Sequence, residues 1–200
     1  MGLIGLATSA IMLVSPQSSK AQNTVNTQPK CDTFERTTEI TPEGTDNKSI
    51  LFNAPSAEIE IQGEPRTAKI VVDLSTNVLY KYDEFGNAEK AYLIASGKKR
   101  TPTHAGIRVV SHTESYPYKS APASTKRRRE PWLYGPKIII LDKLNPETGE
   151  KSQTGEFIHG NNNPDSIGKY ASLGCMRMDN EVIKELSTEV KRGDIVIIKK

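Results

Sequence analysis

Two residues near the end of the sequence have the types needed for acyl-transfer chemistry. Cys175 follows a glycine in a short apolar run, and His159 lies upstream of it at the end of another apolar stretch. An ordinary thiol has a pKa of about 8.5 and is mostly protonated at neutral pH, so it needs a neighbouring imidazole to take its proton. The pair is therefore a candidate nucleophile and general base.

The backbone around Cys175 is suited to a second task. Gly174 places no side chain between the chain and a substrate, and the amide of Cys175, with that of a neighbour, could stabilise the oxyanion of a tetrahedral intermediate. In other enzymes the loss of one such donor typically costs about 2.7 to 4 kcal/mol. These residues predict covalent catalysis without a cofactor, because the cysteine itself carries the acyl group.

Two other interpretations of the cysteine stay open at this point. A lone cysteine is most often a buried structural thiol, although its surroundings here favour a nucleophile. A zinc site would need three or four ligands, and the available residues lack the close pairs typical of such sites. These residues are His104, His112, His159 and Cys175. We therefore expect no metal.

The elements that must position the pair are mainly short strands. From Arg66 onward, short apolar runs alternate with turn residues, as in an antiparallel β domain. We expect strands at 69–74, 78–82, 88–95, 107–111, 137–141, 157–159 and 195–198, with a turn at 145–149. After the cysteine, Asp179 or Asn180 caps a helix. Its apolar residues recur at helical spacing, at Val182, Ile183, Leu186 and Val190.

The segment around the cysteine resembles a known signature. The matching residues are His159-Gly160, followed by Ser172-x-Gly174-Cys175-x-Arg177-Met178. They resemble the signature of the L,D-transpeptidase catalytic domain family, also called the YkuD-type domain. Thr101-Pro102-Thr103 with Gly106 and the hairpin from Ile70 to Tyr80 resemble its upstream part, so the likeness covers about 66–199. It implies a mainly β, sandwich-like domain with one or two short helices, the last near the C-terminus.

The resemblance also implies roles for individual residues. It puts the nucleophile on Cys175, the general base on His159 and the oxyanion hole on the backbone of Gly174 and Cys175. Ser172 matches a small polar position whose backbone helps to orient the histidine.

Substrate binding is implied for Arg177 and Gly160, although an arginine there could equally be a surface or ion-pair residue. The position before the Gly-Cys pair usually carries His, Arg or Lys in this family, and here it is Leu173. We expect this departure to affect substrate affinity or acceptor choice, and to leave the chemistry unchanged.

The implied reaction is cross-linking of peptidoglycan. Cys175 would attack the peptide bond before the terminal D-alanine of a tetrapeptide stem, and the amine of a second stem would resolve the thioester. Water as the acceptor would give an L,D-carboxypeptidase, and other outcomes of the same acyl-enzyme include an amidase. A non-catalytic wall-binding module is the remaining alternative, for which Leu173 is the only hint. Stem peptides and carbapenem-type inhibitors are the expected partners of a monomer.

Length and composition favour one domain with an extension. The chain has 200 residues, of which 36% are hydrophobic. We divide it into a signal peptide or short anchor at 1–21, a polar, largely disordered linker at 22–65 and a catalytic domain at 66–200. The domain should fold without the linker.

A net charge of +3 is too small to indicate nucleic-acid binding, and the basic clusters at 98–100 and 126–129 are typical of solvated loops. Attraction of these clusters to an anionic polymer such as a cell wall is the alternative.

The beginning of the sequence indicates export. The apolar run at 3–14 is too short to cross a bilayer as a mature helix, and Ser19-Lys20-Ala21 resembles a signal-peptidase site. The run lacks a basic residue before it, so it is either cleaved or kept as an anchor. We expect a periplasmic or wall-associated protein without an integral membrane domain. Cys31 lies in the linker and is interpreted as a bystander.

Overall fold

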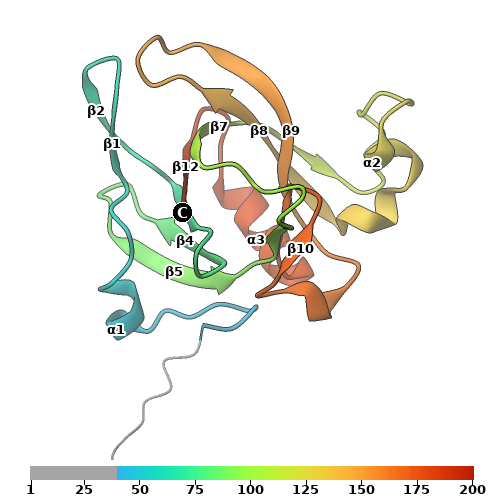
Figure 1. Ribbon diagram of the computed structural model, residues 1–200, viewed down its shortest axis with the longest axis horizontal. Helices are drawn as coiled ribbons and strands as arrows, with labels where there is room; N and C mark the ends of the chain where they lie inside the picture. Colours follow the sequence, from blue (N-terminus) through green and yellow to red (C-terminus); the bar gives the residue numbers. More distant parts are fainter. Residues whose placement is uncertain (1–39) are drawn as a thin grey trace, which may run out of the picture. The chain divides into compact units, whose positions relative to one another are not determined.

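A computed structural model describes residues 40–200. The expected signal segment, the first part of the linker and Cys31 lie outside these residues. Strands are the main regular structure of the described chain, and strand residues outnumber helical residues (Figure 1), which confirms the predicted mainly β fold class. The strands of the main sheet, in spatial order, are β11 (Met176–Arg177), β9 (Lys151–His159), β8 (Lys137–Leu144), β7 (Gly106–Ser115), β12 (Ile195–Lys199), β3 (Ile70–Asp73), β4 (Val78–Tyr82) and β5 (Ala88–Leu93).

Most neighbours in this eight-stranded sheet are antiparallel. Two pairs are parallel, β12 with β3 and β11 with β9. A two-stranded hairpin, β1 (Glu58–Ile61) with β2 (Glu64–Thr67), and a short parallel pair, β6 (Ser96–Gly97) with β10 (Tyr170–Ser172), complete the strands. The sandwich-like layering that was expected thus comes mainly from one curled sheet, which carries a hydrophobic core cluster on each face.

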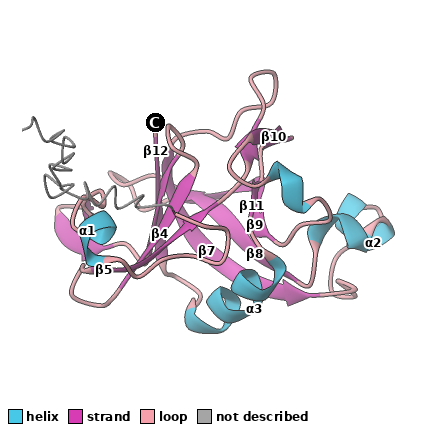
Figure 2. Cartoon of the chain, turned by 90° about the horizontal axis from the view of Figure 1, so that it is seen from below, coloured by secondary structure: helices cyan, strands magenta, loops and turns pink. Residues whose placement is uncertain are grey.

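The largest part of the core lies between this sheet and α3 (Asn180–Glu189). The side chain of Asp179 accepts hydrogen bonds from the N–H groups of Glu181 and Val182, so Asp179 is the N-cap and the predicted helix is confirmed. Figure 2 shows α3 on one side of the sheet, with α1 (Lys48–Leu51) and α2 (Lys126–Arg129) at opposite ends of the molecule. Residues 40–200 contain three α-helices, where one or two were expected.

The described part of the expected linker is folded. Ile50 and Ala57 are buried in a second core cluster on the sheet, and Thr45 pairs with Ala91 beside β5. The Tyr82 hydroxyl donates to the carbonyl of Pro55. Few apolar residues occur between 40 and 57, so the composition resembles a linker, but those few are spaced to cover this face. For residues 40–65 the expectation of disorder was therefore wrong.

The segment between β7 and β8, residues 116–136, packs against β8 and against Phe157 of β9. It contains α2 and the 3-10 helix η1 (Pro131–Tyr134). Tyr118 and Ala121 are buried against the strands, and the Tyr118 hydroxyl donates to the carbonyl of Gly135 at 2.5 Å. We call residues 116–136 the crossing segment. No helix within residues 40–200 is long and apolar enough to span a membrane.

Candidate active site

The predicted nucleophile and base lie on neighbouring strands. Strand β9 ends at His159, and β11 begins directly after Cys175. The two strands are parallel, with Met176 opposite Ile158 and Arg177 opposite His159. Side chains alternate along a strand, and Met176 and Ile158 are both in the core. Cys175 and Arg177 therefore share the opposite face with His159, on two neighbouring strands.

Two backbone groups of β9 lie next to the half-buried thiol of Cys175. Its Sγ lies 3.9 Å from the carbonyl oxygen of Gly155. Burial raises the pKa of Cys175 to about 11, and the charge of Glu156 adds to the rise, whereas the N–H of Phe157 and the Arg177 guanidinium lower it. The thiol is thus protonated at neutral pH, and a base must take its proton at the moment of attack.

His159 is held as a neutral base. It is buried, and its Nδ1 lies 2.6 Å from the carbonyl oxygen of Gly160. A carbonyl can only accept, so Nδ1 carries the proton and Nε2 is left free to act as a base. Burial lowers the pKa of His159 to about 4, and the nearby Arg177 lowers it further, against the opposing effect of the Gly160 and Tyr134 carbonyls. At neutral pH the pair consists of a neutral thiol and a neutral imidazole.

Ser172 shapes the turn that carries the nucleophile. Its hydroxyl accepts from the N–H of Gly174 at 3.0 Å and donates to the carbonyl of Cys175 at 2.5 Å. Its own carbonyl accepts from the Lys98 N–H at 3.1 Å and from the Thr101 hydroxyl at 3.3 Å. The backbone of Ser172 therefore does not orient the histidine as expected, because its acceptor is already used by the loop at 98–101.

The N–H of Gly174 is also occupied, because it donates to Ser172. Gly174 adopts a φ of +120°, which favours glycine, and its carbonyl accepts from the Thr103 hydroxyl at 2.8 Å. Of the two expected oxyanion donors, only the N–H of Cys175 has no acceptor among residues 40–200. Gly174 therefore does not donate to the oxyanion as predicted. Its backbone conformation instead positions the N–H of Cys175.

Gly160, expected to bind substrate, is buried and faces other parts of the chain. A Cβ at this position would lie 2.5 Å from the Asn180 side chain and 3.0 Å from the Cα of Gly135. Its carbonyl orients His159, so it performs the task that was expected of Ser172. The substrate-binding expectation was wrong because the chain packs too closely at Gly160 to admit a ligand.

Arg177 presents a guanidinium to the site. Within residues 40–200 it forms no salt bridge, and its Nε is buried without a hydrogen-bond partner. Its charge lowers the pKa of both His159 and Cys175. A buried donor without a partner is costly, which favours an anionic group of a ligand as the missing partner. The substrate-binding role of Arg177 stays a prediction.

Several residues of the site were not anticipated. The Tyr134 ring lies 4.9 Å from the His159 ring, and the ring of Phe157 meets that of Tyr134 at 6.3 Å. Tyr134 precedes a glycine with a φ of +66°, in a segment read only as a connection between strands. The Pro-Trp-Leu-Tyr-Gly-Pro run at 131–136 was the available signal, because aromatic residues between two prolines are unusual for a solvated loop.

The remaining candidates lie around the site. Leu173 is 70% exposed, so its side chain leaves the nucleophile turn toward solvent. His104 contacts Glu156 and His112 contacts Glu114, each at 3.3 Å. Neither histidine belongs to a group of three or more possible metal ligands in the part of the chain that the structure describes.

A cavity of about 460 Å³ lies beside the loop at 96–103. Its walls include Gly97, Thr103 and Tyr170, with Lys98 and Lys99 among the lining residues. Cys175 and His159 do not line it. The cavity is therefore separate from the reacting groups.

Comparisons with known proteins agree with the geometry. A family model described as the L,D-transpeptidase catalytic domain matches residues 67–198. A curated protein of Bacillus licheniformis, carrying the name L,D-transpeptidase YkuD, is 33% identical over 130 residues, which is 65% of this chain and 64% of that protein. The chain thus spans about 64% of the length of this curated relative.

Solved structures are similar as well. The catalytic domain of an E. faecium L,D-transpeptidase has 25% identity and a TM-score of 0.43, covering 66% of this chain and 97% of that one. L,D-transpeptidase 3 from Mycobacterium tuberculosis, solved with a faropenem-derived adduct, has 14% identity and a TM-score of 0.45, covering 73% and 69%.

Proposed function

Because its residues 67–198 match the family model, the chain belongs to the L,D-transpeptidase catalytic domain family, and we propose that it is a cysteine acyltransferase acting on peptidoglycan. The observation that carries the proposal is the placement of Cys175 and His159 on one face of two paired strands. The proposed donor is a tetrapeptide stem, cleaved before its terminal D-alanine. The proposed acceptor is the side-chain amine of a second stem.

The first half of the reaction forms an acyl-enzyme. His159 Nε2 takes the proton of the Cys175 thiol as the sulfur attacks the carbonyl carbon of the scissile peptide bond. The N–H of Cys175 then donates to the oxyanion, since it has no acceptor among residues 40–200. Collapse of the intermediate breaks the C–N bond, and the imidazolium returns its proton to the departing amine of D-alanine.

The second half releases the thioester. The amine of a second stem attacks the thioester carbonyl, and His159 takes a proton from that amine. The C–S bond breaks, and the thiolate is protonated by the imidazolium. An amide cross-link results, and both side chains return to the neutral forms that burial favours.

Arg177 is the proposed site for a substrate carboxylate. Its guanidinium lies on the same face as the pair and lacks a partner for Nε in the described residues. The terminal carboxylate of a stem is planar and anionic, which suits a guanidinium. Occupation by this carboxylate would hold the scissile bond next to the sulfur.

Other outcomes use the same acyl-enzyme. Water in place of the amine would give L,D-carboxypeptidase activity, and attack on an existing cross-link would give an amidase. Product analysis with purified stem peptides separates them. A non-catalytic wall-binding module is disfavoured, because binding alone gives no physical need for a neutral imidazole on the same face as a half-buried thiol. We place the protein outside the cytoplasm, in the periplasm or at the wall.

The test uses a carbapenem, whose strained ring mimics the scissile amide. The intact mass of the incubated protein should show one adduct, mapped to Cys175, and Cys175→Ala should abolish it. Cys31→Ser should leave it unchanged, and His159→Ala should slow acylation by about 10² to 10⁴, the usual contribution of a positioned base. A folded, reduced protein that stays unmodified, or an adduct on Cys31, would overturn the proposal.

A further inference from the structure

One basic residue of α2 points inward. The helix consists of Lys126, Arg127, Arg128 and Arg129, and its sequence is typical of a solvated loop. The Arg127 side chain is nevertheless only 16% exposed. Its Nε lies 2.9 Å from one oxygen of the Glu114 carboxylate and its Nη2 lies 3.4 Å from the other. Glu114, on β7, is buried, so this two-point ion pair fixes the plane of the guanidinium.

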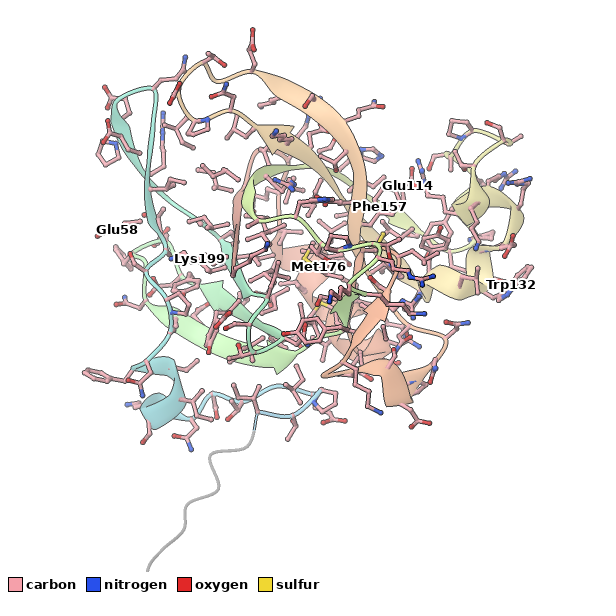
Figure 3. All side chains as sticks on the ribbon, in the orientation of Figure 1. Glu58, Glu114, Trp132, Phe157, Met176 and Lys199 are labelled. Carbon is pink, nitrogen blue, oxygen red and sulfur yellow. The ribbon has the colours of Figure 1, made fainter. Side chains whose placement is uncertain are left out.

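The same guanidinium lies over an aromatic ring of the catalytic strand. The Arg127 Cζ is 5.3 Å from the centroid of the Phe157 ring. Figure 3 shows Glu114 and Phe157 close together, on the side of the sheet that faces α2. Arg127 thus joins the crossing segment to β7 through Glu114 and to β9 through Phe157.

The contacts continue from Phe157 to the base. Phe157 and His159 share one face of β9 because they are two residues apart. The Phe157 ring meets the Tyr134 ring, which in turn lies 4.9 Å from the His159 ring. An unbroken series of contacts therefore leads from Arg127 to the imidazole, and Tyr134 is its last member.

We propose that Arg127 is a positioning residue for the reaction: it holds the crossing segment against β9, so that Tyr134 covers His159 and keeps water from the base. The inference rests on the proposed role of His159. The other groups facing the imidazole are Arg177 from β11, the Gly160 carbonyl and the Tyr134 carbonyl. Arg177 and Gly160 do not depend on α2. The Tyr134 carbonyl belongs to the crossing segment and raises the pKa of His159, so its loss would oppose the effect of lost burial, which is the larger of the two.

The prediction is a change in the titration of His159, followed by NMR of its ring protons in the full chain. Burial is the main cause of its low pKa, which is about 4. In Arg127→Ala the midpoint should rise by at least about one pH unit, a tenfold change in proton affinity, because water reaches the ring. Arg127→Lys should fall between the two, since it keeps the charge and loses the planar stack.

Arg129→Ala is the matched control. Arg129 is exposed on the same helix, so its loss should leave the midpoint unchanged. Carbapenem acylation should fall about tenfold or more in Arg127→Ala and stay unchanged in Arg129→Ala, because a displaced base costs rate. The titration needs no turnover, so a failed proposed function leaves this test intact.

A second variant, Phe157→Leu, tests the inference if Arg127→Ala does not fold. Phe157→Leu keeps the ion pair with Glu114 and removes the aromatic face under the guanidinium. Its His159 midpoint should rise in the same direction. An unchanged midpoint in folded Phe157→Leu, or in folded Arg127→Ala, would overturn the inference and reduce Arg127 to a structural ion pair.

Discussion

Asn180 hydrogen-bonds both backbone groups of Asn161. Its Oδ1 accepts from the Asn161 N–H at 2.8 Å, and its Nδ2 donates to the Asn161 carbonyl at 3.0 Å. The side-chain amide thus pairs with the chain as a neighbouring strand would. Asn180 is the first residue of α3, and Asn161 follows the His159-Gly160 pair. The helix therefore fixes the loop that leaves the catalytic base.

Replacing this amide should weaken the loop. Asn180→Asp removes the donor and places a carboxylate oxygen next to the Asn161 carbonyl, which should lower the free energy of unfolding by about 1 to 3 kcal/mol. Glu181→Gln, at an exposed position one residue further, is the matched control and should change it by less than about 0.5 kcal/mol. Urea unfolding of both variants measures the difference, and equal stabilities would contradict the pairing.

The pH dependence of acylation should reflect a buried base. His159 must be neutral to take the thiol proton, and its pKa is lowered to about 4, so activity should fall only as the pH drops toward 4. An ordinary histidine would give an acid limb near 6.5. The rate of carbapenem acylation between pH 3.5 and 8, with circular dichroism at each pH to confirm folding, distinguishes these cases. A midpoint near 6.5 would show that the imidazole is open to water.

The same group links stability to acid. The pKa of His159 is 6.5 before folding and about 4 after it, so the unfolded chain binds the proton more readily. Its contribution is fully present above about pH 6.5 and is lost as the pH falls toward 4, by about 3 kcal/mol. His159→Gln should unfold with a smaller loss over this range. Identical pH slopes for the two proteins would argue against a buried neutral imidazole.

Leu173 should affect substrate use and leave thiol reactivity nearly unchanged. Its side chain is 70% exposed and can neither donate nor accept a proton. We expect Leu173→His to leave the rate of alkylation of Cys175 at neutral pH within about tenfold of the parent, a barrier change of about 1.4 kcal/mol. Iodoacetamide labelling measures this rate. A larger change would place position 173 in the activating network.

The residues before β1 should stabilise the domain. Ile50 is buried against the sheet, so Ile50→Ala should lower the free energy of unfolding by about 2 to 4 kcal/mol. Phe52 is 88% exposed two residues later, and Phe52→Ala is the matched control, with little expected effect. A chain beginning at residue 66 should fold but with reduced stability. If Ile50→Ala behaves like the control, the region is a linker after all.

The sequence predicted the strands whose burial follows a simple pattern. β4 begins and ends at the predicted residues, and the cap at Asp179 was one of two named candidates. β7 and β9 are longer than predicted, because their additional residues, 112–115 and 151–156, are polar or glycine and mostly exposed. Alternation of apolar and polar residues is the main sequence signal for a strand, and these additional residues lack it.

The site was predictable to the level of residue types. Cys175 and His159 belong to one motif, so their roles could be proposed from the sequence. Residue spacing does not reveal which carbonyl orients His159 or which amide is free for an oxyanion. The first depends on the hydrogen bond that the Gly160 carbonyl accepts, and the second on the one that the Ser172 hydroxyl accepts. The contact of Tyr134 with His159 depends on the path of the crossing segment, which residue spacing alone does not give.

The position of β12 has a consequence for the order of folding. This strand lies between β3 and β7, with Val196 opposite both Ile70 and Arg108. Until residues 195–199 emerge from the ribosome, β3 to β5 and β7 to β9 are two groups of strands with open edges and no shared hydrogen bonds. Closing the sheet then requires contacts between residues far apart in sequence, which makes folding slow and late. A nascent chain therefore cannot close this sheet before residues 195–199 have emerged.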